Sequence, residues 1–269
     1  MNNYLHGYIK RSGFHQGMAL MILIVMGLGV WGWFMSIKLD QIKVTGTESA
    51  EAVDIKTLAS LSEGERLFHI DAAQLSSRVE QHPWVLEAHI SRFPTGTLRI
   101  KIVERKPVVL VLNSSGRPAF FLDRDGIRLP LAVERAYDVP VFHGYSDGFS
   151  ELGETSDSTV REFLRVLADD VAGTADMISE VRLDSKTKVE SKTRSAAETK
   201  VTADLIELRL EPLGNHGAVP VVLGSSKFEQ KFNMLHAFWY QAMLPGQEQD
   251  FGWIDLRYDS QIVVRDAAP

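Results

Sequence analysis

The sequence predicts an α+β protein in which an N-terminal transmembrane helix is followed by two soluble domains rich in strands. Three observations support this prediction. Residues 17–35 carry no charge, the segment 39–46 alternates apolar and polar side chains, and two amphipathic helical patterns, at 158–171 and 227–243, interrupt the later strands. The length of 269 residues fits two domains of ordinary size, and a hydrophobic content of 45% is sufficient for packed cores.

The apolar segment near the amino terminus is long enough to cross a bilayer. As a helix, residues 17–35 would be about 28 Å long, close to the roughly 30 Å hydrocarbon core of a membrane. Trp31 and Trp33 lie near its carboxyl end, where indole rings favour the headgroup boundary. A cleaved signal peptide would have a shorter apolar region followed by a small-x-small cleavage site, which residues 31–35 lack. The pattern favours a retained anchor.

Basic residues near this segment predict its orientation. Lys10 and Arg11 precede it without any acidic residue, whereas Lys38, Asp40 and Lys43 follow it. The positive-inside bias therefore places the amino terminus in the cytoplasm and the remainder of the chain on the other side of the membrane.

The first soluble domain shows the order strand, helix, helix, strand, strand. These elements are expected at 39–46, 54–61, from Asp71 to the residues before Pro83, 85–93 and 98–102. Asp71 can cap the second helix, with Gln74 completing a capping box. Trp84 is interpreted as a core aromatic at the corner between helix and strand. Alternation along 85–93 places Leu86 and Ala88 on one face and Val85 on the other.

The second soluble domain is richer in strands. Strands are expected at 108–112, 119–122, 178–183, 204–210, 218–223, 253–258 and 261–265, and helices at 158–171 and 227–243. Each helix has an apolar stripe, formed in the first by Val160, Phe163, Leu164, Leu167 and Val171 and in the second by Phe228, Phe232, Leu235, Trp239 and Ala242. Residues 123–126 form a turn in which Gly126 supplies a positive φ. Residues 186–200 have almost no apolar side chains, so they are predicted to form a mobile hairpin tip.

Composition and motifs exclude several function classes. The chain has no cysteine, and 29 basic against 35 acidic residues give a net charge of -6, so neither a cysteine-based site nor a nucleic-acid partner is expected. Gly27, Gly29 and Gly32 match a dinucleotide-binding spacing, but they lie inside the apolar segment rather than between a strand and a helix. No catalytic, cofactor-binding or small-molecule site is predicted.

A metal site is also not predicted. Asp123, Asp125 and Glu134 have the spacing of three ligands of a calcium loop. Ile127 and Leu129 stand at other ligand positions, however, and apolar side chains cannot coordinate the ion.

Several short motifs of the first domain carry a family resemblance. They are Leu67-Phe68-His69-Ile70-Asp71, Pro83-Trp84-Val85 with Ala88, Arg92-Phe93-Pro94, Thr97-Leu98 and Glu104-Arg105-Lys106-Pro107-Val108. Their order and spacing resemble the POTRA domain of the FtsQ/DivIB bacterial cell-division proteins. Pro94-Thr95-Gly96-Thr97-Leu98 has one residue more than the usual Pro-x-Thr-Leu of that family, so a different turn is expected before the last strand.

The second domain continues this resemblance. The matching residues are Val222-Leu223-Gly224, Lys227, Ile254-Asp255-Leu256-Arg257-Tyr258-Asp259-Ser260 and Val263-Val264-Arg265. The insertion at 184–204 and the residues after Arg265 have no counterpart. The implied organisation is a cytoplasmic tail at 1–16, a transmembrane helix at 17–37, a POTRA-like domain at 38–107, an FtsQ-type β domain at 108–265 and a tail at 266–269.

The resemblance also implies a partner-binding segment. The partner-binding tyrosine of better-known Gram-negative relatives corresponds to Tyr258, and the neighbouring serine corresponds to Ser260. Together with the last strand, the expected partner-binding residues are Tyr258, Ser260, Gln261, Ile262, Val263 and Val264. Gln261 stands where the family has glycine, and no aromatic residue follows the strand. Because the last strand is apolar where an edge strand is usually protected by charge or proline, a partner strand is expected to pair with it.

The implied function is that of a membrane-anchored periplasmic scaffold of the bacterial division machinery. Such a protein would lie in the cell inner membrane and link early and late division proteins, with the FtsB and FtsL coiled-coil proteins as partners. It would be no enzyme and would need no cofactor. Two alternatives stay open from the sequence, a POTRA-type export or envelope-assembly factor and an anchored envelope hydrolase.

Overall fold

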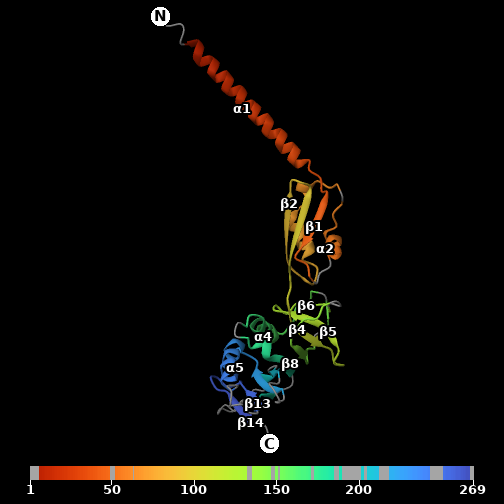
Figure 1. The fold of residues 1–269 in the computed structure, drawn as a ribbon, viewed down its shortest axis with the longest axis vertical. Coiled ribbons are helices and arrows are strands. Elements are labelled where there is room, and N and C mark those ends of the chain that lie inside the picture. The colour runs from red at the N-terminus through yellow and green to blue at the C-terminus, as the bar shows by residue number, and fades with distance from the viewer. Residues whose placement is uncertain are drawn as a thin grey trace. The chain divides into compact units, whose positions relative to one another are not determined.

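The computed structural model divides the chain into two compact units, Met1–Glu104 and Arg105–Pro269 (Figure 1). The residues that it describes are 6–48, 52–62, 64–131, 135–146, 149–150, 152–170, 173–184, 188–189, 201–202, 205–211, 218–242 and 251–266. Helices and strands are mixed in both units, so the predicted α+β class is confirmed.

The first element is a single long helix, α1 (His6–Met35). It begins at His6, before the predicted span at 17–37, since no proline interrupts the residues that precede the span. The stretch Gln16–Met35 has a mean hydropathy of 2.1 and none of it is buried, whereas a core helix of a soluble domain would be mostly buried. Within the described residues, this is the one helix with the length and composition of a membrane span.

The remainder of the first unit is a three-stranded sheet with helices. Its elements are β1 (Gln41–Thr45), α2 (Ala52–Ala59), the 3-10 turn η1 (Leu67–His69), α3 (Ala72–Val79), β2 (Val85–Phe93) and β3 (Thr97–Glu104). The strand order is β1-β3-β2, in which β1 runs parallel and β2 antiparallel to β3. The predicted order of strand, helix, helix, strand, strand is confirmed.

Two local predictions for this unit are confirmed. The Asp71 carboxylate accepts hydrogen bonds from the backbone N–H groups of Ala73 and Gln74 at 2.9 and 3.1 Å, which caps α3. Trp84 is 3% exposed and belongs to the core.

The faces of β2 differ from the prediction. Val85 and Ala88 are both buried, although simple alternation puts them on opposite faces. The reason is an irregularity in the ladder, where the register against β3 shifts between Val85 and Glu87. This bulge leaves Leu86 39% exposed instead of placing it beside Ala88.

The second unit contains a nine-stranded mixed sheet. Its strands are β4 (Pro107–Leu112), β5 (Pro118–Asp123), β6 (Arg128–Leu129), β7 (Val141–His143), β8 (Ile178–Asp184), β11 (Leu205–Leu210), β12 (Val219–Gly224), β13 (Phe251–Asp255) and β14 (Val263–Asp266). The sheet order is β14-β13-β12-β11-β8-β7-β4-β5-β6. The helices of this unit are α4 (Ser158–Ala168), η2 (Ala175–Met177) and α5 (Phe228–Ala242).

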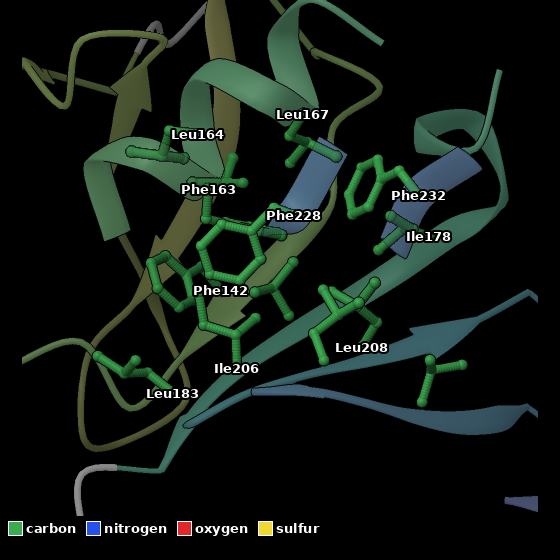
Figure 2. Packing of buried hydrophobic residues seen from close by; sticks show 14 of the residues in the cluster. Phe142, Phe163, Leu164, Leu167, Ile178, Leu183, Ile206, Leu208, Phe228 and Phe232 are labelled. Carbon is green, nitrogen blue, oxygen red and sulfur yellow. The ribbon is translucent and has the colours of Figure 1, made fainter. Parts of the chain in front are cut away.

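One hydrophobic core joins α4 and α5 to this sheet (Figure 2). The ring of Phe163 on α4 makes edge contacts with Phe228 and Phe232 on α5, with centroids 5.6 and 6.2 Å apart. Sheet residues such as Ile206 and Leu208 lie beneath these rings (Figure 2). The predicted apolar stripes are buried at all of the following positions: Val160, Phe163, Leu164, Leu167, Phe228, Phe232, Leu235 and Trp239. Val171, also predicted for the first stripe, and the side chain of Ala242, predicted for the second, lie outside what the structure describes, and α4 ends at Ala168.

The polar stretch predicted as a hairpin tip has a short ladder at its base. β9 (Lys188–Val189) and β10 (Val201–Thr202) pair antiparallel, with Val189 opposite Val201. The tip itself, 190–200, lies outside the described residues.

Candidate functional site

The carboxyl-terminal segment is positioned by a crossover from β12 through α5 to β13. The two strands are parallel, with Val221 opposite Ile254 and Val222 opposite Asp255. Because parallel strands end at the same edge of a sheet, the carboxyl ends of β12 and β13 meet beside the beginning of α5. The segment that contains Tyr258 starts from this place.

An ion pair between a buried carboxylate and a half-exposed arginine ends β13. The side chain of Asp255 is 1% exposed, and Arg257 turns back onto it. The backbone N–H and Nε of Arg257 donate to Asp255 Oδ1 at 2.9 and 3.0 Å, and Arg257 Nη2 donates to Oδ2 at 2.6 Å. This turn ends the strand at Asp255, so the predicted extension of the strand to Tyr258 is wrong.

The same contacts determine the ionisation of this pair. Burial alone would raise the pKa of Asp255, but the hydrogen bonds and charge of Arg257 outweigh it, and the net pKa lies below the ordinary value. The hydrogen bond to Asp255 raises the pKa of Arg257. The pair is therefore ionised at neutral pH.

Two lysines at the start of α5 contact the end of β12 and the turn after β13. Lys231 is 7% exposed, and its Nζ donates to the carbonyl oxygen of Leu223 at 2.5 Å. Burial lowers the pKa of Lys231, which the negative charge of Asp259 partly opposes. Lys227 Nζ lies 2.7 Å from Asp259 Oδ1 and is more exposed. A Cβ atom at Gly224 would lie 3.5 Å from Lys231 Nζ, and its φ of +86° favours glycine.

The predicted partner-binding residues form a turn followed by a strand. Ser260 has a φ of +58°, in the left-handed region, which a β-strand cannot include. β14 begins at Val263, two residues later than the predicted strand start at Gln261, which is therefore wrong. The positions of the six residues are as follows: Tyr258 and Ser260 in the turn, Gln261 and Ile262 between turn and strand, Val263 and Val264 in β14.

These residues present one exposed edge. In the described part of the chain, β14 pairs with β13 alone and ends the sheet order. Tyr258 is 53% exposed and Val263 is 38% exposed, whereas Ile262 and Val264 pack against the core. The outer side of β14 thus offers unpaired backbone groups beside an exposed aromatic ring, which is the arrangement that strand addition requires.

The described residues also bear on the metal hypothesis and include one pocket elsewhere in the second unit. No group of three or more His, Asp or Glu side chains that could hold a metal lies among them. Asp123, considered above for a calcium loop, is 2% exposed, accepts from the N–H groups of Asp125 and Ile127, and pairs with Arg105 at 2.8 Å. A pocket of about 300 Å³ is lined by α4 and α5 residues that include Arg165, and by none of the β14 residues.

The ion pairs beneath the turn escaped the sequence analysis. Asp255 and Asp259 stand in the sequence only as parts of a motif. Asp255 pairs with Arg257 inside that motif, whereas the partner of Asp259 is Lys227, just before α5 and far away in the chain. The available signal was the spacing of Lys227 and Lys231, which puts two cations on one face of a helix that begins at the ends of two strands.

Acid should loosen the turn by protonating Asp255. The folded pKa lies below the unfolded value of about 3.9, so this carboxylate's contribution to stability is complete above pH 4 and is lost as the pH falls through the folded pKa. We expect the NMR signals of the Arg257 and Tyr258 amides to move toward disordered positions over that acid range.

Two variants control this titration. Asp255→Asn should remove the transition and leave the turn loosened at neutral pH as well. Asp259→Asn should retain it, because Arg257 pairs with Asp255. Arg257 and Tyr258 signals that stay constant under acid, while the core of the unit remains folded, would contradict the role given to Asp255.

Comparisons with known proteins match both units. The family model described as POTRA domain, FtsQ-type, matches residues 37–105, and the one described as FtsQ/DivIB, C-terminal related, matches residues 106–265. A cell division protein FtsQ of Rhodothermus marinus is 34% identical over 266 residues, which cover 96% of this chain and 90% of the relative. The FtsQ protein of Salinibacter ruber is 32% identical over 93% of this chain and 91% of its own length. That of Geotalea daltonii is 26% identical over 98% of this chain and 90% of its own length.

Proposed function

The chain belongs to the FtsQ/DivIB family of cell-division proteins, and we propose that it is a membrane-anchored scaffold of the bacterial division machinery. In this role it links early and late division proteins and binds partners by strand addition along β14. The role is one of binding rather than catalysis, and it requires no cofactor.

The observation that carries this proposal is the exposed edge of β14. A partner strand that lies along it gains backbone hydrogen bonds, and the exposed ring of Tyr258 offers apolar surface beside the new ladder. Val263 points away from the core on the same strand. The coiled-coil division proteins FtsB and FtsL, implied by the resemblance to the family, are the partners that we propose for this edge.

We propose that α1 anchors the chain in the cell inner membrane with a single pass. Lys10 and Arg11 support a cytoplasmic tail at 1–16 and a span at 17–37. The POTRA-like domain at 38–107, the β domain at 108–265 and the tail at 266–269 then lie in the periplasm. Relatives named as cell division proteins cover the full sequence of domains, which supports the same assignment.

The orientation is tested by reporter fusions after Pro269. Alkaline phosphatase, which is active only outside the cytoplasm, should be active there, because the positive-inside bias retains Lys10 and Arg11 in the cytoplasm. A reporter that works only in the cytoplasm, fused at the same position, should be inactive. The reverse pattern would show that the proposed orientation is wrong.

Partner capture tests the scaffold role. The tagged full-length chain, extracted in detergent from cells of its own source, should retain single-span division proteins, which mass spectrometry identifies. Replacing residues 17–37 by an unrelated span should preserve this capture, because Gly27, Gly29 and Gly32 make no sustained small-residue face for helix packing. Loss of capture in the exchanged variant at normal membrane levels would place the recognition in α1 instead of in the soluble units.

A further inference from the structure

The junction between α1 and the first sheet points to a lipid-binding loop. Residues 65–70, here called the interface loop, follow α2 and contact the end of α1 through Phe68, whose ring centroid lies 3.9 Å from that of Phe34. We propose that the interface loop lies in the headgroup layer of the bilayer, with Phe68 as an interface aromatic and with Lys38 and Arg66 binding a lipid phosphate. This inference rests on the proposed membrane anchoring of α1.

The interface loop is held to the residues that leave α1 by a short backbone ladder. The N–H of Leu39 donates to the carbonyl oxygen of Glu65 at 2.7 Å, and the N–H of Leu67 donates to that of Ile37 at 2.9 Å. Between these bonds, Lys38 and Arg66 form an antiparallel bridge. The polypeptide therefore passes from the helix into the domain without a free linker, and the loop stays at the level where α1 ends.

The core dictates the outward position of Phe68. Leu67 is fully buried and Ile70 is 4% exposed, so these two side chains fix the loop to the interior of the domain. Arg92 Nη1 donates to the carbonyl oxygens of Phe68 and Ile70 at 3.4 and 3.0 Å, which holds the backbone between them. Phe68 itself is only partly buried and contacts Phe34.

The depth of Phe68 follows from its contact. Phe34 lies in the last turn of the stretch Gln16–Met35, which has the composition of a membrane span. Trp33 precedes it and is 64% exposed. A ring that packs on Phe34 is therefore at the end of the hydrocarbon region, where aromatic side chains favour the boundary with the headgroups.

The charges at this junction indicate the lipid group that binds there. Residues opposite each other in an antiparallel bridge have side chains on the same face, and two like charges in that position repel each other. Both Lys38 and Arg66 are exposed, and neither makes an ion pair with any residue that the structure describes. A phosphate between the two cations would remove this repulsion, and the headgroup layer supplies phosphates at this depth.

Site-specific labels in the full-length chain test the location of the loop. Because the chain has no cysteine, single variants can be labelled cleanly with an environment-sensitive fluorophore: Phe68→Cys in the loop, Met26→Cys in the span and His89→Cys on the exposed side of β2. The labelled chains are reconstituted in vesicles of phosphatidylcholine with phosphatidylglycerol. Some of these lipids carry nitroxide quenchers, either at the headgroup or deep in the acyl chain.

We expect the label at residue 68 to be quenched most strongly by headgroup nitroxides and the label at residue 26 by deep nitroxides. The label at residue 89 should remain unquenched. A label at residue 68 that is unquenched, while that at residue 26 is quenched at depth, would overturn the inference and leave the anchor intact. A label at residue 26 that shows no lipid contact would overturn the proposed anchoring and this inference with it.

Charge variants test the phosphate site separately. In the Phe68→Cys chain, nitroxide-labelled phosphatidylglycerol should quench the label more strongly than nitroxide-labelled phosphatidylcholine, because the two cations attract the anionic lipid. Lys38→Glu with Arg66→Glu should remove this preference, while the backbone ladder keeps the label at headgroup depth. The matched pair Lys38→Arg with Arg66→Lys should retain the preference. An unchanged preference for phosphatidylglycerol in the acidic pair would refute phosphate binding by these two residues.

Discussion

Replacing Tyr258 with alanine should weaken partner capture by roughly 30-fold, the equivalent of about 2 kcal/mol for a central aromatic residue of an interface. The ring is 53% exposed in the free chain and lies beside the unpaired edge of β14, so its removal takes away contact area without opening the core. Affinity is measured with the full-length chain and a purified partner from the capture experiment. Tyr240→Ala is the matched control, because this tyrosine is 73% exposed on α5, away from the turn.

Proline substitutions in β14 test the backbone part of the same prediction. In an antiparallel ladder, successive N–H groups point alternately toward the paired strand and away from it. Of the two variants Val263→Pro and Val264→Pro, one therefore removes an amide that bonds β13 and the other removes an amide that faces outward. The variant that removes the outward amide should lose partner binding, while its melting temperature stays near that of the parent chain. Binding that survives both prolines, or that is lost only together with folding, would refute strand addition at β14.

Removing the ring of Phe163 should cause a large loss of stability in the second unit. Phe163 is fully buried between α4, α5 and the sheet, and it contacts Phe228 and Phe232 (Figure 2). A buried Phe→Ala change costs about 3–5 kcal/mol through lost burial and the remaining cavity. This is a large part of the roughly 5–15 kcal/mol that stabilises an ordinary domain.

Hydrogen exchange followed by mass spectrometry can read this effect in each unit separately. Peptides from β8 and β11 should exchange faster in Phe163→Ala, while peptides from β2 and β3 of the first unit should be unchanged, because the two units have separate cores. Phe163→Leu, which fills much of the same volume, should cost less than about 1.5 kcal/mol. Equal exchange in the parent and alanine chains would show that α4 is not essential to this core.

The elements with a strong side-chain period were predictable from the sequence, and those defined by tertiary pairing were not. The stripe with Phe228, Phe232 and Trp239 predicts α5 because a helix with this spacing buries one face. The three residues of β7 are too few to show a period, and the bulge at Leu86 exists only against its neighbour β3.

The candidate site shows the same division. An apolar edge strand near the end of the chain could be predicted, and the structure places β14 at the edge of the sheet. The start of β14 at Val263 could not be predicted. The turn before it places Ser260 in the left-handed region, and serine usually avoids this region, so the residue type does not indicate the turn. The pairing of Arg257 with Asp255 could not be predicted either, because it forms where β13 ends at Asp255. The alternating pattern predicts a strand that continues to Tyr258.

The short strand β7 has a consequence for mechanical load. The chain enters the second unit at β4, whereas the proposed partner strand lies at β14, and β7 stands between these two parts of the sheet. Its register pairs only two residues with β4 and three with β8. A pull between the membrane and a partner on β14 therefore crosses a seam with few backbone hydrogen bonds. At this seam the fully buried ring of Phe142 packs in the core common to both parts, so side-chain contacts oppose separation where backbone hydrogen bonds are few.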